Sequence, residues 1–186
     1  MKIGIIVGST RPGRRARPVA EWVHQVASQR TDATFELVDV SDYALPLLDE
    51  PMPAMTGTPY THAHTLAWSE TIRALDGFII VTPEYNHGTS AALKNALDYL
   101  YAEWNNKAVG FVSYGTNGGV RAVETLRMVA GDLQMADVTM QVALSIFSDF
   151  TEEHTVLASD YHLKRLDTML DQLIRWTTAL ASARRS

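Results

Sequence analysis

Short, strongly apolar segments rich in β-branched residues constrain the fold of this chain more than any other feature. Residues 2–8 (KIGIIVG) and 77–82 (GFIIVT) contain almost no polar side chain. A strand without polar alternation buries both of its faces, which is typical of a strand inside a parallel sheet. Three further segments are predicted to be strands, the last of them irregular: residues 34–40, 107–114 and 138–147.

Segments with helical periodicity alternate with these strands. In residues 17–29, Val19, Trp22, Val23 and Val26 recur at the spacing that places side chains on one face of a helix. The helices predicted in this way are residues 17–29, 62–75, 89–100, 120–133 and 159–183. The last of them has leucines at heptad spacing, but over too few heptads for a coiled coil, so packing on the sheet is the favoured interpretation.

The alternation of strand and helix, without an internal repeat or linker, determines the expected fold class. Five strands alternating with five helices predict an α/β protein with a doubly wound, five-stranded parallel sheet and helices on both faces. The flavodoxin-like strand order 2-1-3-4-5 suits this number of strands best. The length of 186 residues favours a single domain over residues 1–186. Residues 41–60 are proline-rich, and no regular structure is expected there.

The composition excludes several classes of function. The formal net charge is -5 and the sequence pI is about 5.6, so no general nucleic-acid or anionic-membrane surface is expected. The absence of cysteine removes disulfides, thiol nucleophiles, iron–sulfur clusters and cysteine-type zinc sites. No segment approaches the roughly 18 apolar residues of a membrane span, and the N-terminal apolar stretch is too short for a signal peptide. A cytoplasmic location is therefore expected.

The loop after the first predicted strand is strongly basic. Four arginines lie around the start of the following helix: Arg11, Arg14, Arg15 and Arg17. Helix N-termini already carry partial positive charge, so an anion should neutralise this cluster. The hydroxyls of Ser9 and Thr10 beside free backbone amides favour a phosphate. The alternative is a solvated loop whose arginines pair with nearby carboxylates.

Two further loops should reach the same edge of the sheet, because ligands of such sheets bind outside the carboxyl ends of the strands. Residues 82–89 (TPEYNHGT) combine an aromatic side chain, an amide and backbone groups, a set that suits a flat heteroaromatic ring. Residues 113–119 (SYGTNGG) offer hydroxyls, amides and glycines that permit close backbone approach. Each segment alone could be a plain turn, whereas three converging loops favour a ligand site.

Familiar motifs of other enzyme classes are missing or incomplete. The first loop has the glycine spacing of a Walker A loop, but Arg14 and Arg15 stand where its lysine and magnesium-binding hydroxyl belong. The dinucleotide pattern G-x-G-x-x-G and the serine-hydrolase elbow G-x-S-x-G are absent. His62 and His64 form His-x-His, but histidines at a helix start more often face solvent, so no metal site is expected.

At these loops the sequence resembles the NADPH-dependent FMN reductase family, the flavodoxin-like group that includes quinone, azo-dye and chromate reductases. The matching pieces are residues 8–11 (GSTR), 83–88 (PEYNHG), 93–96 (LKNA), 113–115 (SYG) and 118–119 (GG). Residues 45–51 (LPLLDEP) are similar too. The likeness spans most of residues 2–145, and P-E-Y-N is its most specific part.

The resemblance implies non-covalent FMN and a set of positions that hold it. The residues expected around the phosphate are Ser9, Thr10, Arg11 and the backbone amides of Ala16 and Arg17. The residues expected along the isoalloxazine ring are Pro83, Glu84, Tyr85 and Asn86, with Ser113, Tyr114 and Gly115 near its other edge.

The resemblance also implies the reaction. NADPH or NADH would pass a hydride to N5 of the flavin, and a small-molecule acceptor such as a quinone, free flavin, azo compound or chromate would then take the electrons. Because the flavin does the chemistry, no catalytic side chain is expected. Two alternatives stay open: a flavodoxin-type electron carrier supplied by a protein partner, and a flavin-binding module without turnover. A homodimer or homotetramer is expected, in which residues 41–60 could cover a neighbour's site.

Overall fold

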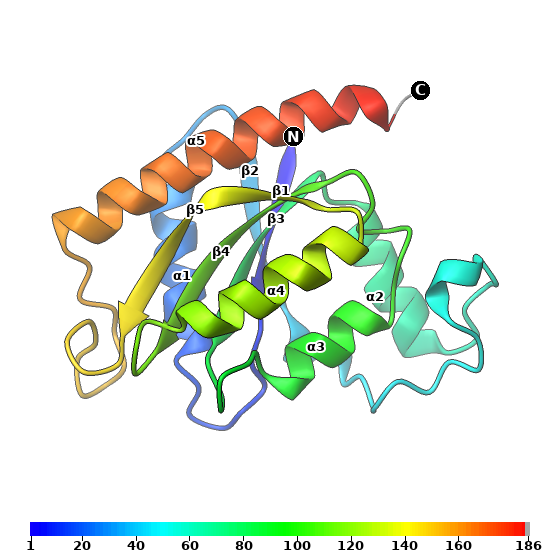
Figure 1. The fold of residues 1–186 in the computed structure, drawn as a ribbon, viewed down its shortest axis with the longest axis horizontal. Coiled ribbons are helices and arrows are strands. Elements are labelled where there is room, and N and C mark those ends of the chain that lie inside the picture. Colours follow the sequence, from blue (N-terminus) through cyan, green and yellow to red (C-terminus); the bar gives the residue numbers. More distant parts are fainter. Residues whose placement is uncertain (185–186) are drawn as a thin grey trace.

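The computed structural model describes residues 1–184, which contain one five-stranded sheet with all strands parallel (Figure 1). The strands in chain order are β1 (Lys2–Val7), β2 (Thr34–Asp39), β3 (Gly77–Pro83), β4 (Ala108–Gly115) and β5 (Ala136–Ser145). Their spatial order is β2-β1-β3-β4-β5. This order confirms the predicted doubly wound, flavodoxin-like fold class.

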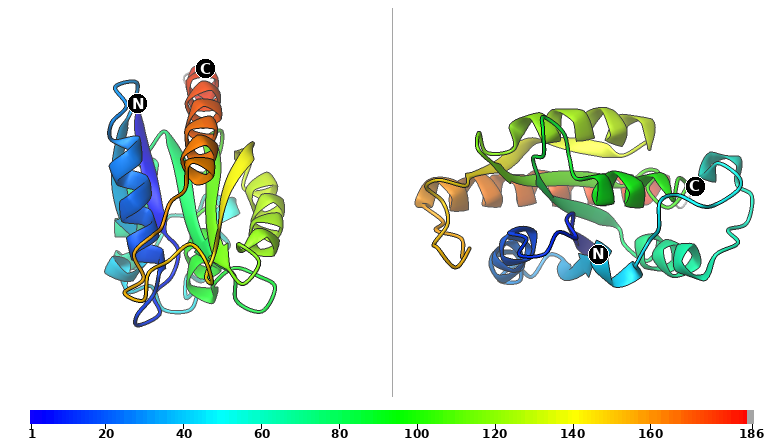
Figure 2. Two further views of the ribbon diagram at one scale, coloured as in Figure 1. Left: turned by 90° about the vertical axis from the view of Figure 1, so that its left-hand side faces the viewer. Right: turned by 90° about the horizontal axis from the view of Figure 1, so that it is seen from below.

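Helices cover both faces of the sheet. Within the described residues they are α1 (Ala16–Ala27), α2 (Ala63–Arg73), α3 (Ala91–Asp98), α4 (Val120–Asp132) and α5 (Asp160–Ala183). Figure 2 shows α1 and α5 on one face and α4 on the other, where α2 and α3 also pack. Each helix predicted from the sequence is confirmed, with ends that differ by a few residues.

The central strand β3 is buried along its whole length, because its side chains point alternately into two apolar layers. Ile79 and Val81 pack in the layer of α1 and α5. Phe78 and Ile80 pack in the layer of α2, α3 and α4. The lack of polar alternation in this segment is therefore a direct consequence of its position in the middle of the sheet.

The long final helix α5 packs on β4 and β5. Its side chains Leu166, Met169, Leu170 and Leu173 are almost completely buried in the layer that α5 shares with α1. This confirms packing on the sheet in preference to a coiled coil. Although α5 is 24 residues long, it is not apolar enough to cross a membrane, and the same holds for every other helix in residues 1–184.

Two segments differ from the sequence-based expectation. β5 begins and ends two residues earlier than expected. Its pairing with β4 shifts in register between Val109 and Phe111, in agreement with the irregular strand that the sequence predicts. Residues 41–60 were expected to lack regular structure, yet short 3-10 helices form at Val40–Tyr43 and Ala54–Thr56. A single 3-10 turn needs few backbone bonds, so neighbouring prolines do not prevent it.

A buried lysine joins the start of β4 to the end of α2. Lys107 Nζ donates to the carbonyl oxygens of Ile72 at 2.8 Å and Arg73 at 3.3 Å. These carbonyls belong to the last turn of α2, where they lack partners within the helix. Burial lowers the pKa of Lys107 to about 8, and the nearby charge of Arg184 acts in the same direction.

We expect Lys107 to make the protein more stable as the pH rises from about 8 to about 10. The folded state releases the lysine proton near pH 8, whereas the unfolded chain keeps it until its ordinary value near 10.5. The unfolded state therefore binds more protons in this window, and the free energy of unfolding rises by at most about 3 kcal/mol. Urea unfolding of the wild type and Lys107→Met across this pH range measures the effect. A difference between the two proteins that stays constant with pH would contradict it.

Candidate functional site

A cavity opens at the carboxyl ends of the central strands, at the bottom of the view in Figure 1. The chain connections from β1 and into β3 run on opposite faces of the sheet, so this is the switch point at which doubly wound sheets bind ligands. The cavity has a volume of about 340 Å³ and adjoins a groove of about 580 Å³. The residues that line both are Arg11, Glu84, Tyr85 and Thr116. The cavity is also lined by Gly13, Arg14, Arg15, Pro83, Tyr114, Gly115, Ile146 and His154.

The loop after β1 is fixed to the neighbouring strand ends by short contacts. Ser90, at the start of α3, donates its hydroxyl to the carbonyl oxygen of Gly8 at 2.5 Å. A Cβ atom on Gly8 would lie 2.5 Å from the carbonyl oxygen of Val81, so only glycine permits this approach. The hydroxyl oxygens of Ser9 and Tyr85 are 3.2 Å apart, which joins the first loop to the second.

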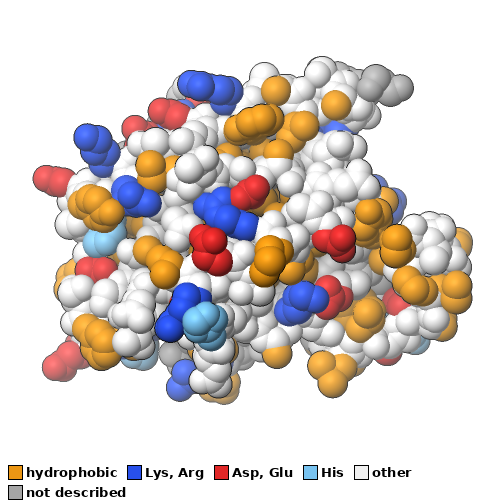
Figure 3. Space-filling view, viewed as in Figure 1, with side chains coloured by type: hydrophobic (Ala, Val, Ile, Leu, Met, Phe, Trp, Pro, Cys, Tyr) orange, Lys and Arg blue, Asp and Glu red, His pale blue; other side chains and the backbone are white. Residues whose placement is uncertain are grey.

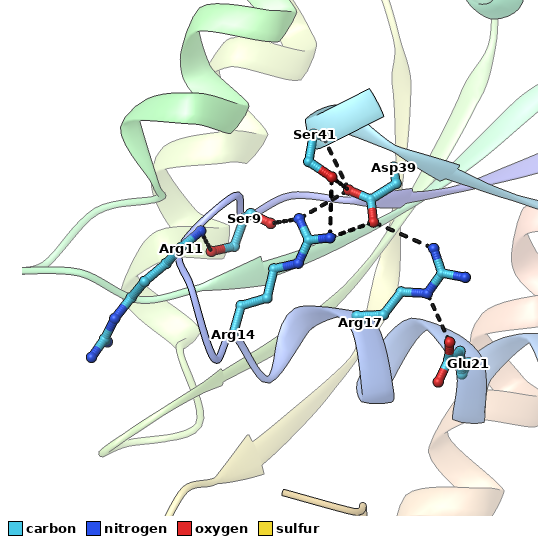
Figure 4. A network of polar contacts seen from close by, with 7 residues as sticks. All are labelled: Ser9, Arg11, Arg14, Arg17, Glu21, Asp39 and Ser41. Carbon is cyan, nitrogen blue, oxygen red and sulfur yellow. Dashed lines mark hydrogen bonds and ion pairs between the residues drawn. The ribbon is translucent and has the colours of Figure 1, made fainter. Parts of the chain in front are cut away.

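Two of the four arginines near this loop are paired with carboxylates (Figure 4). Arg14 binds Asp39 at the end of β2 through both Nη atoms, at 2.6 and 3.0 Å, and also donates to the carbonyl oxygen of Ser9. Arg17 donates to Glu21 at 2.7 Å and lies 3.4 Å from Asp39. Carboxylate pairing, the alternative raised by the sequence, therefore applies to these two side chains.

The other two arginines, Arg11 and Arg15, have no carboxylate partner within residues 1–184. Figure 4 shows Arg11 extending away from the ion pair of Arg14. The guanidinium of Arg15 lies 4.9 Å from the centre of the Phe150 ring, and its buried Nε has no hydrogen-bond partner. The buried hydroxyl of Tyr114 makes no hydrogen bond of ordinary geometry, although the Ser9 side chain and the Ala16 backbone lie close enough to lower its pKa. Such buried unpartnered donors are rare, and beside two free cations they indicate a site for an anion.

Hydroxyl and backbone donors complete this anion site. Burial raises the pKa of Tyr114 well above its ordinary value, and nearby Tyr85 raises it further, so the hydroxyl keeps its proton and can donate. α1 begins without a side-chain cap, which leaves the amides of Ala16 and Arg17 without partners inside the helix. Arg15, the residue before α1, lines the cavity, whereas Ala16 and Arg17 do not, so contacts of their amides with an anion stay a prediction.

The loop after β3 contains a tight turn that faces the groove. Tyr85 and Gly88 exchange two backbone hydrogen bonds of 2.9 and 3.2 Å, and Asn86 and His87 have positive φ angles of 50° and 77°. This is the geometry of a two-residue hairpin turn, which normally selects glycine or asparagine. Non-glycine residues in this conformation concentrate at ligand sites, and Tyr85, Asn86 and His87 all line the groove.

Glu84 has a structural role that its motif does not reveal. Its amide donates to the carbonyl oxygen of Tyr114 at 3.0 Å, which joins the ends of β3 and β4. Its carboxylate is 5% exposed and accepts from Arg121 Nε at 2.5 Å and from the Arg121 amide at 3.1 Å. That amide is in the first turn of α4, where a negative charge is stabilising. The carboxylate of Glu84 is therefore engaged within the protein.

Ser113 stabilises the loop after β4 from within the protein. Its fully buried hydroxyl donates to the carbonyl oxygen of Gly118 at 2.7 Å, which closes the glycine-rich turn. Gly119 has a φ of 74°, and a Cβ atom there would lie 2.9 Å from the Tyr114 backbone. Tyr114 and Gly115, the last two residues of β4, line the cavity, whereas Ser113 holds the following turn in place.

The structure brings together part of the predicted set. The predicted residues that line the cavity are Arg11, Pro83, Glu84, Tyr85, Tyr114 and Gly115, and Asn86 lines the groove. Ser9 is buried, and Thr10 lines a separate hollow beside Ser41 and Asn95. Their individual contacts with a ligand stay predictions.

Sequence reasoning missed the contribution of the loop after β5. Ile146 and His154 line the cavity, and Phe150 packs against Arg15. No motif marks these residues, and the loop reaches the cavity only because β5 lies next to β4 in the sheet. The positive φ of His154, 67°, is a feature of the folded backbone that has no signal in the sequence.

A larger hollow of about 780 Å³ lies between α2 and residues 54–60 and shares no lining residue with the cavity. Its buried carboxylate, Glu103, accepts from Ser69 at 2.6 Å and from Tyr60 and Arg73 at 3.0 Å each. These buried polar groups satisfy one another, and no lining residue of this hollow has a buried side-chain polar atom without a partner.

The fold places the chain in the class of flavodoxin-like α/β proteins, and a cavity lies at the switch point of its sheet. The solved structure of FerB, a flavoenzyme NAD(P)H:(acceptor) oxidoreductase from Paracoccus denitrificans, aligns with a TM-score of 0.74. The alignment covers 96% of this chain and 97% of that chain at 19% identity, which shows a shared fold alone.

Sequence comparison then identifies the family. Residues 1–149 match the family described as NADPH-dependent FMN reductase. An NAD(P)H-dependent FMN reductase from Schizosaccharomyces pombe is 44% identical over 149 residues, 80% of this chain and 74% of the relative. A quinone reductase from Pseudomonas putida is 32% identical over 159 residues, 79% and 81% of the two chains. The chain belongs to the NADPH-dependent FMN reductase family, which confirms the oxidoreductase class and the expected use of FMN and NAD(P)H.

Arg14→Ala should destabilise the fold, whereas Arg11→Ala should not. Removal of Arg14 leaves the carboxylate of Asp39, whose side chain is 3% exposed, without its bidentate partner. The free energy of unfolding should fall by about 3 kcal/mol. Arg11 has no such partner to leave behind. Chemical unfolding of both variants without added flavin measures the difference. Equal stability of the two variants would show that the pair of Arg14 and Asp39 does not hold this loop.

Proposed function

We propose that residues 1–186 form a single FMN-binding domain that oxidises NAD(P)H and reduces a small-molecule acceptor. The observation that carries this proposal is the presence of two free cations, Arg11 and Arg15, beside the unpartnered hydroxyl of Tyr114. A phosphate supplies the negative charge and acceptor oxygens that these groups lack. The adjoining groove is open and broad enough for a flat ring, so the residues present fit FMN.

The phosphate would lie between the two arginine side chains and the first turn of α1. Arg11 and Arg15 neutralise its charge, and the amides of Ala16 and Arg17 donate to its oxygens. Since the pair of Arg14 and Asp39 already fixes the loop, binding requires little reordering of the backbone.

The ring would lie in the groove along Pro83, Tyr85 and Asn86, with Gly115 at its far edge. When bound, FMN supplies the redox chemistry: it accepts a hydride from NAD(P)H and passes the electrons to a second acceptor. The side chains of this protein bind and orient the reactants. No acid–base side chain is assigned.

Quinones are the first candidate class of acceptor, because the groove is open to solvent and a quinone reductase is among the relatives. Free flavins, azo compounds and chromate would reach the same surface. A flavodoxin-type carrier would use the same cavity but take its electrons from a protein. Direct oxidation of a pyridine nucleotide separates these functions.

The purified protein should retain a yellow colour after excess FMN is added and removed, and NADPH or NADH should bleach it under anaerobic conditions. Bleaching is expected because the groove leaves one face of the ring open to the nicotinamide. Visible absorption spectra before and after addition of the donor measure it. Retained colour without bleaching would favour the electron carrier or the flavin-binding module, and no retained flavin would refute the proposal.

Arg11→Ala and Arg15→Ala should each weaken FMN binding about ten- to a hundredfold, since a hydrogen bond to a charged group contributes about 1.5–3 kcal/mol. Quenching of flavin fluorescence on titration measures the affinity. Arg17→Ala is the matched control, because its guanidinium is turned toward Glu21 and Asp39 and only its amide is assigned to the phosphate. An unchanged affinity in Arg11→Ala would remove Arg11 from the phosphate site.

We expect a homodimer or homotetramer in solution. Figure 3 shows hydrophobic side chains gathered on the right of this face, where the segment drawn in cyan in Figure 1 lies. Leu47, Met55 and Leu66 in this region are 83%, 70% and 52% exposed. Burial of such side chains against a second copy removes apolar surface from water. Size-exclusion chromatography with light scattering measures the assembly, and a monomer at every concentration would contradict the expectation.

A further inference from the structure

Two histidines and an aspartate meet at the start of α2, away from the flavin cavity. Each side chain offers one ligand atom: a ring nitrogen from His62 and from His64, and a carboxylate oxygen from Asp49. These three atoms lie within 4.8 Å of one another. His64 Nε2 is 3.0 Å from Asp49 Oδ1, and His62 Nε2 is 3.9 Å from Asp49 Oδ2. The sequence predicted no metal site, because histidines at the start of a helix more often face solvent, and Asp49 precedes the two histidines by 13 and 15 residues and so forms no local motif with them.

One of these separations is close to the distance between neighbouring ligand atoms around a metal ion. Zinc binds histidine nitrogen and carboxylate oxygen at about 2.0–2.1 Å in a tetrahedron, so adjacent ligand atoms are about 3.3 Å apart. His64 Nε2 and Asp49 Oδ1 are 3.0 Å apart, close to this value. His62 Nε2 lies 3.9 Å from the other carboxylate oxygen and 3.2 Å from the carbonyl oxygen of Asp49, so its ring has to turn to reach the same ion. The two imidazole rings are stacked, with centroids 5.1 Å apart and planes 7° from parallel. Parallel rings do not direct their nitrogens at one point, so binding requires rotation of the His62 side chain, and its 42% exposure leaves room for this rotation.

The start of α2 explains how two histidines so close in sequence reach one point. Inside a helix, residues two positions apart point to different sides. His62 is the residue before the helix, with extended backbone angles of φ −97° and ψ 140°, and His64 lies in the first turn. Because the backbone at His62 is extended, its ring lies on the same side of the chain as the ring of His64.

Asp49 is oriented by hydrogen bonds from α3 and its end. The hydroxyl of Tyr99 donates to Asp49 Oδ1 at 2.8 Å. The neighbouring Leu48 amide donates to Asn95 Oδ1 at 2.9 Å, and Asn95 Nδ2 donates to the carbonyl oxygen of Pro46 at 2.6 Å. Metal-binding carboxylates are typically held by such outer hydrogen bonds, which fix their direction before the ion arrives.

The local charge favours a cation even though helix N-termini repel one. Glu50 occupies the free amides at the start of α2: it accepts from Thr61 N at 3.0 Å and from His62 N at 3.1 Å. It also accepts from the hydroxyl of Thr61 at 2.8 Å. Asp49 and Glu50 thus bring two carboxylates to the start of α2, and their negative charge attracts a divalent ion.

We propose that Asp49, His62 and His64 bind one divalent transition-metal ion, with zinc the best match to this ligand set. The side chains of His62 and His64 are 42% and 25% exposed, so water completes the coordination. None of the three residues lines the flavin cavity or its groove. The ion joins residues 41–60 to α2 and leaves the flavin site independent of it.

Equilibrium dialysis of the full chain against zinc chloride in metal-free buffer tests this site. We expect one equivalent of zinc per chain, and at least tenfold weaker binding in His62→Ala, His64→Ala and Asp49→Asn. His24→Ala, which removes a histidine outside the cluster, is the matched control and should bind zinc as the wild type does. Magnesium should not displace zinc, because it prefers oxygen ligands in an octahedron.

Two further measurements separate loss of ligands from loss of fold. Asp49→Asn keeps the volume of the side chain and an acceptor for Tyr99, and circular dichroism of each variant reports whether the helices remain. Zinc should raise the Tm of the wild type but not of folded His64→Ala, while the FMN affinity of both stays the same. Failure of the wild type to take up zinc, or uptake that survives all three substitutions, would overturn the proposal.

Discussion

The ion pair of Arg14 and Asp39 determines how the loop after β1 meets the sheet. Asp39 ends β2, so the pair ties this loop to the carboxyl end of the neighbouring strand, and Ser41 bonds to both partners. A carboxylate at this position that was free to pair with Arg11 or Arg15 would neutralise the charges that face the cavity. By engaging Asp39, Arg14 leaves Arg11 and Arg15 without a carboxylate partner among the described residues, and the proposed binding of a phosphate depends on these two free charges.

The fold was predictable because its physical causes are local. The apolar residues of β3 and the helical spacing in α1 each follow from burial against a neighbouring layer, and both patterns are visible in a short window of sequence. The pairing of Arg14 with Asp39 joins residues 25 apart and leaves no local pattern. The sequence therefore predicted the basic loop but not which of its arginines would be engaged within the protein.

The candidate site was predicted as a set of positions, and the structure separates their roles. Glu84 and Ser113 belong to segments that resemble the family, yet the carboxylate of Glu84 caps α4 and the hydroxyl of Ser113 closes a turn. A sequence motif can specify a backbone conformation as well as ligand contacts, and several side chains in these motifs stabilise the backbone and do not bind a ligand. Tyr114 differs from them in that its buried hydroxyl has no partner, a property that only three-dimensional packing reveals.

The loop after β5 forms one wall of the cavity, and this wall differs from the floor in how tightly its backbone is packed. The floor consists of loops between central strands, where Gly8 and Gly119 have no room for a side chain. Ile146 and His154 extend from the edge strand β5, and the family match ends at residue 149, inside this loop. Surface loops tolerate insertion and substitution far better than the elements that they connect. The wall that Ile146 and His154 form is therefore freer to change in sequence than the floor, where a side chain in place of Gly8 or Gly119 would meet the backbone.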